Sequence, residues 1–116
     1  MNLQECYRLM GGDYKEVLSR LMTEELVLRF LKKFKEDNML ESLEETVAEK
    51  EWEAVFRISH NLKGVCQNLG ITNLAESGSE LCETVRNGAP TVDVESYLEA
   101  VRRDYRVVIE ALEQTL

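Results

Sequence analysis

Residues 51–70 read EWEAVFRISHNLKGVCQNLG, and this stretch has the most regular helical pattern in the chain. On a helical wheel at about 100° per residue, its apolar side chains fall within one arc of roughly 100°. These side chains are Val55, Ile58, Leu62, Val65, Cys66 and Leu69. Gly70 follows them and suits the left-handed backbone position that often ends a helix. We therefore expect a helix over residues 51–69 that buries one stripe against other helices.

The opposite side of the same wheel is polar and carries the chain's one histidine. Lys63, Gly64 and Gln67 each fall within about 60° of His60, away from the apolar stripe. We call these four residues the His60 face. Phe56 lies one turn before His60, and the wheel predicts that its ring faces water there. The sequence therefore predicts an exposed imidazole in the middle of a well-formed helix.

Helix-capping residues divide the rest of the chain into further segments. Ser, Thr, Asp and Asn side chains cap helix starts because their oxygen atoms accept hydrogen bonds from free backbone amides. The expected caps are Asp13, Thr23, Asn38, Thr72 or Asn73, and Thr91 or Asp93. Gly11–Gly12 and the turn at residues 87–90 separate neighbouring helices. We expect these helices near residues 3–10, 13–21, 23–35, 38–47, 72–85 and 91–116.

Apolar side chains recur at three- and four-residue intervals in all these segments. The expected core includes Leu3, Tyr7, Met10, Val17, Leu18, Leu21, Leu26, Val27, Phe30, Leu31, Phe34, Leu40, Leu43, Val47, Leu74, Leu81, Val85, Val94, Leu98, Val101, Tyr105, Val108, Leu112 and Leu116. Four long stripes with short connections are most simply buried in an antiparallel bundle. The predicted fold is therefore all-α: an antiparallel four-helix bundle at about 23–115, with two short N-terminal helices at about 1–22. We expect residues 1–116 to form a single domain.

Composition limits the classes of partner. The 116 residues have a formal net charge of -8, and no face rich in Lys and Arg stands out. Nucleic acids and anionic membranes both attract cationic surfaces, so neither is an expected partner. Cys6, Cys66 and Cys82 cannot all pair with one another, which is typical of a reducing compartment. With no signal peptide and no apolar run of the roughly 20 residues that span a bilayer, we expect a cytoplasmic protein.

The His60 face suits phosphoryl chemistry. A neutral imidazole is nucleophilic near pH 7, and its bond to a phosphoryl group is labile enough to transfer that group again. Lys63 can reach a group attached to His60, since residues three apart are neighbours on a helix. Glycine inside a helix costs about 1 kcal/mol relative to alanine, so Gly64 calls for an explanation. Its missing side chain leaves room for a bulky partner at the imidazole.

The segment Ser59-His60-Asn61-Leu62-Lys63-Gly64, continued by Asn68-Leu69-Gly70, resembles the His-x-x-Lys-Gly signature of histidine phosphotransfer (HPt) domains. The resemblance implies a phosphorelay carrier. His60 would accept a phosphoryl group from a receiver-domain aspartate and pass it to another receiver. Lys63 would stabilise the phosphoryl group and Gly64 would provide clearance. Receiver domains of response regulators or hybrid histidine kinases would be the partners, with any Mg²⁺ bound by the receiver.

The resemblance is incomplete at two positions. Ser59 stands where the family often has alanine. Some members orient the histidine with a glutamine on the next helix, where this chain offers Ser79, Cys82 and Glu83. Gln67, on the same helix as His60, is an alternative partner for the imidazole.

Other functions stay open at this stage. The chain could be an interaction module without chemistry, or the phosphorylatable part of a larger kinase. An enzyme is disfavoured, because no nucleotide-binding loop and no paired nucleophile and base can be assembled. The same reasoning predicts no ATP site, no cofactor and no metal site, and we expect a monomer. For Phe56, both packing against a neighbouring helix and contact with a docking partner stay open.

Overall fold

Seven α-helices and no strands make up the computed structural model, which describes residues 1–116. The helices are α1 (Leu3–Met10), α2 (Tyr14–Leu21), α3 (Glu24–Glu36), α4 (Met39–Ala48), α5 (Trp52–Leu69), α6 (Thr72–Thr84) and α7 (Val94–Thr115). The predicted all-α class is confirmed. No helix combines the length and the hydropathy needed to cross a membrane.

Three of the expected caps form as the sequence predicts. The side chain of Asp13 accepts a hydrogen bond from the Glu16 amide at the start of α2, at 3.1 Å. Thr23 and Asp93 do the same at the starts of α3 and α7. Asn38 occupies the N-cap position of α4, but its side chain caps no amide.

The start of α6 differs from the expectation. Ile71 is its N-cap residue, so the prediction that Thr72 or Asn73 caps this helix is wrong. The amide of Asn73 instead donates to the carbonyl of Gly11, at 3.1 Å. A backbone acceptor from the loop after α1 therefore satisfies an amide that a side chain would otherwise cap.

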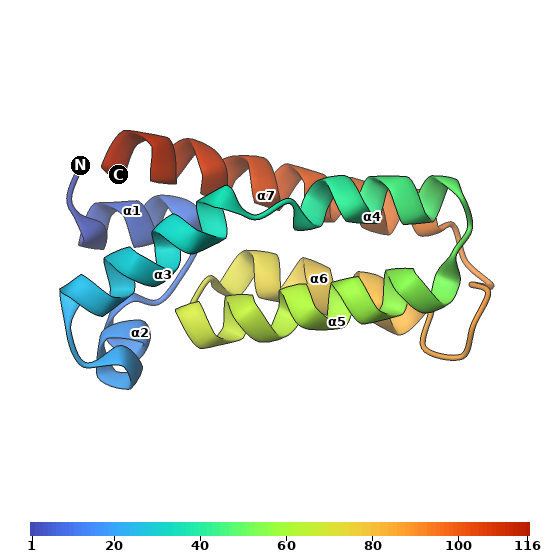
Figure 1. Ribbon diagram of the computed structural model, residues 1–116, viewed down its shortest axis with the longest axis horizontal. Helices are drawn as coiled ribbons and strands as arrows, with labels where there is room; N and C mark the ends of the chain where they lie inside the picture. Colours follow the sequence, from blue (N-terminus) through green and yellow to red (C-terminus); the bar gives the residue numbers. More distant parts are fainter.

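The longer helices form the predicted four-helix bundle (Figure 1). Helices α5, α6 and α7 occupy three of its positions, and consecutive helices run in opposite directions. The fourth position is shared by α3 and α4, which follow one another along the molecule and both contact α5 and α7. Residues 37–38 separate these two helices. The two short N-terminal helices are added outside, α1 along α7 and α2 against α3 and α5.

Buried apolar side chains from all seven helices form one continuous core. Within α3 the buried residues are Val27, Leu31 and Phe34, which share one face of the helix. The expectation that Phe30 belongs to the core is wrong, because it lies beside that face and is 37% exposed. Leu116 at the end of the chain is also exposed, contrary to expectation.

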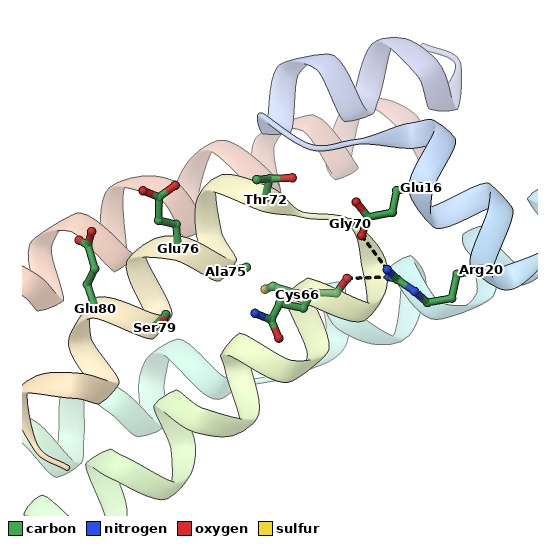
Figure 2. Close-up of a pocket in the computed structure, with 10 residues that line it drawn as sticks. Glu16, Arg20, Cys66, Gly70, Thr72, Ala75, Glu76, Ser79 and Glu80 are labelled. Atoms are coloured by element: carbon green, nitrogen blue, oxygen red, sulfur yellow. Dashed lines mark hydrogen bonds and ion pairs between the residues drawn. The ribbon is translucent and has the colours of Figure 1, made fainter. Parts of the chain in front are cut away.

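Side chains and backbone from the N-terminal helices hold the C-terminal end of α5. Gly70 ends the helix with φ 69°, as its left-handed role requires, and its carbonyl accepts from the Asp13 amide at 2.8 Å. The buried Tyr7 hydroxyl donates to the Leu69 carbonyl at 2.7 Å. Arg20 of α2 reaches across to the same end (Figure 2) and donates to the carbonyls of Gln67 and Asn68, each at 2.7 Å. These bonds satisfy carbonyl groups that a helix end leaves without intrahelical partners.

Candidate functional site

His60 lies in the middle of α5 and is exposed, as the wheel predicts. Its neighbours Ser59 and Leu62 point into the bundle and are fully buried. The Ser59 hydroxyl donates back to the Val55 carbonyl at 2.7 Å, so burying this hydroxyl leaves no unsatisfied polar group. The polar residue that replaces the family's usual alanine is therefore accommodated within the helix.

Lys63 is half-buried on the side of α5 that faces α6. Its ammonium makes no ion pair, although the Glu83 carboxylate of α6 lies near it. Arg86 is the main cause of the lowered pKa of Glu83, and the positive charge of Lys63 adds to the effect. The ammonium of Lys63 is therefore not neutralised by a direct ion-pair partner.

Gly64 is exposed, and a Cβ atom added there would meet nothing within 4 Å. Gly78 of α6 gives a contrast, because a Cβ atom there would lie 3.5 Å from the Leu62 side chain. Close packing of α5 on α6 accounts for the glycine at 78. No packing contact accounts for the glycine at 64.

Phe56 is half-buried, so the expectation that its ring faces water is wrong. Its ring is stacked with the imidazole of His60, with centroids 5.8 Å apart and planes inclined by 15°. The Arg86 guanidinium lies 5.7 Å from the centre of the same ring. The ring is partly covered because the C-terminal end of α6 packs beside it, an arrangement that a wheel of α5 alone does not contain.

Gln67 is exposed and lies on the far side of the His60 face, toward α2 and α6. It lines a cavity of about 620 Å³ together with Arg20, Cys66 and Glu80 (Figure 2). No hydrogen bond joins its side chain to another residue, so it does not supply the alternative partner for the imidazole. The structure brings His60 together with Phe56 and not with Gln67.

A groove of about 450 Å³ runs between α4 and α5 and includes His60 itself. Its other lining residues are Asn38, Met39, Ser42, Arg57, Ile58 and Asn61. Arg57 is three residues before His60, and it forms no ion pair within the chain. The wheel could have shown this second cation, because Arg57 falls about 60° from His60.

The arrangement combines an exposed nucleophile with cations and with open space. No side-chain carboxylate or cysteine hydrogen-bonds to the imidazole, and no group of three His, Cys, Asp or Glu residues is placed to hold a metal ion. Such a site can accept and release an electrophilic group that a partner delivers.

The sequence comparison agrees with this geometry. The family model described as Hpt domain matches residues 25–115, which include α5 and all of the His60 face. The chain therefore belongs to the Hpt domain family, as the His-x-x-Lys-Gly resemblance predicts. Membership gives it a histidine phosphotransfer role in a phosphorelay, and Hpt domains typically partner with receiver domains. Neither the search of curated proteins nor the search of solved structures found a match.

Proposed function

We propose that this protein carries a phosphoryl group on His60 between two receiver domains. A ring nitrogen of His60 attacks the phosphorus of an aspartyl phosphate on the first receiver. The new N–P bond forms as the P–O bond to the aspartate breaks, and the aspartate leaves as a carboxylate. In the second transfer, a carboxylate oxygen of another receiver attacks the same phosphorus and the N–P bond breaks.

The observation that supports this proposal is the exposure of the chain's one imidazole in the middle of α5. Phosphoryl transfer between two proteins requires the nucleophile to reach an atom inside the partner's own site. A histidine sealed in the bundle could not do so. A surface histidine on a flexible loop would be held less firmly than one on a helix packed along the core.

Lys63 and Gly64 have supporting roles in the proposal. The Lys63 ammonium stabilises the negative charge on the phosphoryl oxygens, because charge-assisted hydrogen bonds are stronger than neutral ones. Gly64 lets the receiver approach, because no side chain stands one turn after His60. The nearby Glu83 carboxylate is occupied by Arg86, at 2.6 Å, and leaves Lys63 available.

Incubation with phosphorylated receiver domains tests the proposal. The wild-type chain should take up label, and His60→Gln should take up none, because an amide cannot form the N–P bond. His60→Gln should also keep the wild-type unfolding midpoint, since the replaced ring is exposed. Lys63→Ala should still accept label, but more slowly or with a shorter lifetime of the phosphorylated form.

Two results would contradict the proposal. Label on the His60→Gln variant would place the acceptor elsewhere. Receiver binding without any label on the wild-type chain would instead favour an interaction module that has no chemistry of its own.

A further inference from the structure

The imidazole of His60 lacks the hydrogen bond that commonly orients a reactive histidine. The side-chain hydrogen bonds nearest to it on α5 belong to Ser59 and Asn61, and none reaches a ring nitrogen. On the facing helix α6, the Cys82 thiol donates to the Phe56 carbonyl at 3.8 Å and not to the imidazole. A ring without such a bond can rotate about its side-chain torsions unless something else holds it.

The ring of Phe56 is stacked with the imidazole of His60. The two rings are nearly parallel, at 15°, and their centroids are 5.8 Å apart. This separation lies within the range of about 4.5–7 Å that aromatic pairs prefer. A stacked neighbour disfavours rotation of the imidazole out of that plane.

Phe56 is in turn held by the end of α6. The Arg86 guanidinium lies 5.7 Å from the centre of the Phe56 ring, at a distance where a cation is attracted to the ring face. Glu83 fixes that guanidinium through two hydrogen bonds, from Nε at 2.9 Å and from Nη2 at 2.6 Å. Both oxygens of the carboxylate are used, and such two-point contacts define direction as well as distance.

We propose that Phe56 is the positioning residue of His60, with Arg86 and Glu83 holding the Phe56 ring in place. Stacking thus orients the imidazole in this chain in place of a hydrogen bond. It leaves both ring nitrogens free of intramolecular partners. The inference rests on the proposed function of His60 for its catalytic meaning, but the orientation itself can be measured without a receiver.

The chain's one histidine makes the spectroscopic test direct. In a ¹³C–¹H NMR spectrum, the imidazole protons of the wild-type chain should be displaced upfield by the ring current of Phe56. Phe56→Leu should remove that displacement and increase the mobility of the imidazole on relaxation measurements. Phe56→Tyr keeps a ring and should restore both properties. Phe30→Leu makes the same chemical change on α3 and should leave the imidazole signals unchanged.

Transfer kinetics then show whether the orientation matters. At saturating phosphorylated receiver, Phe56→Leu should lower the rate roughly two- to tenfold, the range that the loss of one aromatic pair predicts. The receiver concentration that gives half the maximal rate should stay the same, and Phe56→Tyr should recover the rate. Glu83→Gln, which weakens the hold on Arg86 without touching the core, should reduce the upfield displacement in part.

The outcomes separate the two proposals. Unchanged imidazole signals in Phe56→Leu would overturn the positioning role, even if transfer works. A variant that needs more receiver but keeps the maximal rate would overturn it too, since Phe56 would then be a docking residue. A wild-type chain that shows the displaced signals but accepts no phosphoryl group would instead overturn the proposed function.

Discussion

The last turn of α5 and the imidazole of His60 belong to the same helix, yet the N-terminal helices form hydrogen bonds with the last turn and none with the imidazole. At the end, Tyr7 and Arg20 donate to the last carbonyl groups, and the backbone of Asp13 donates to Gly70. Around His60, the Asn61 amide donates to the Met39 sulfur of α4 and the Cys82 thiol of α6 donates to the Phe56 carbonyl, but no hydrogen bond reaches the imidazole. The fold therefore fixes the backbone that carries the imidazole and leaves the imidazole available to a partner.

The two glycines of this stretch show the same difference. Gly70 has φ 69°, and a Cβ atom there would lie 2.8 Å from the Asp13 carbonyl oxygen. Gly64 is helical, and a Cβ atom there would meet nothing within 4 Å. One glycine is required by the structure of the chain, whereas the other is unexplained by it. Substitutions at Gly70 and at Gly64 should therefore affect different properties of the protein.

The largest change in stability is expected for Gly70→Ala. The left-handed conformation and the close approach to Asp13 should together lower the free energy of unfolding by about 2–4 kcal/mol. Urea denaturation measures this loss. Gly88→Ala provides a comparison without a close contact, because its φ of 102° is also positive and a Cβ atom there meets nothing within 4 Å. An unchanged free energy of unfolding in Gly70→Ala would contradict both the conformational cost and the contact with Asp13.

A smaller decrease in the free energy of unfolding is expected for Tyr7→Phe. This change removes the hydroxyl that donates to the Leu69 carbonyl at 2.7 Å and leaves a buried acceptor unpaired. The free energy of unfolding should fall by about 1–3 kcal/mol, while the folded protein keeps its phosphoryl transfer. Tyr105→Phe provides the control, because the Tyr105 hydroxyl is buried without any partner. Removing it should be neutral or stabilising, and an equal loss there would contradict the role given to the Tyr7 bond.

The smallest effect on stability, with the opposite sign, is expected at Gly64. Gly64→Ala should raise the free energy of unfolding by up to about 1 kcal/mol, since alanine is the better helix former and has room. Gly64→Gln should also fold, but its side chain would shield the imidazole and slow transfer from the receiver. Calorimetry and receiver titration measure the two properties separately. Rapid transfer to a stable Gly64→Gln variant would remove the clearance role.

Local signals in the sequence predicted most of the fold. The stripe of α5, the caps Asp13, Thr23 and Asp93, and the left-handed Gly70 all depend on interactions within a few residues. The errors involve other helices. Asn73 finds its acceptor in the loop after α1, and Phe30 stays at the surface because α3 buries only one face against α5 and α7.

In the candidate site, too, the sequence predicted the features within one helix and missed a contact between helices. A wheel of one helix was enough to predict that His60 is exposed beside Lys63 and Gly64. The wheel also places Phe56 one turn before His60, but it could not predict that Arg86 lies over the Phe56 ring, because Arg86 follows the end of α6. The contact between Arg86 and Phe56 depends on how α5 and α6 lie along one another. Sequence periodicity does not contain this information.

The burial of the three cysteines has a chemical consequence for the whole molecule. A thiolate is a stronger nucleophile than an imidazole, but Cys6, Cys66 and Cys82 are 0%, 0% and 2% exposed. Burial also raises the pKa of the Cys66 thiol to about 12, so this sulfur stays protonated at neutral pH. The three buried thiols are therefore shielded from electrophiles in solution. A single cysteine introduced on the surface would be the one thiol to react with a maleimide probe, which makes the chain suitable for site-specific labelling.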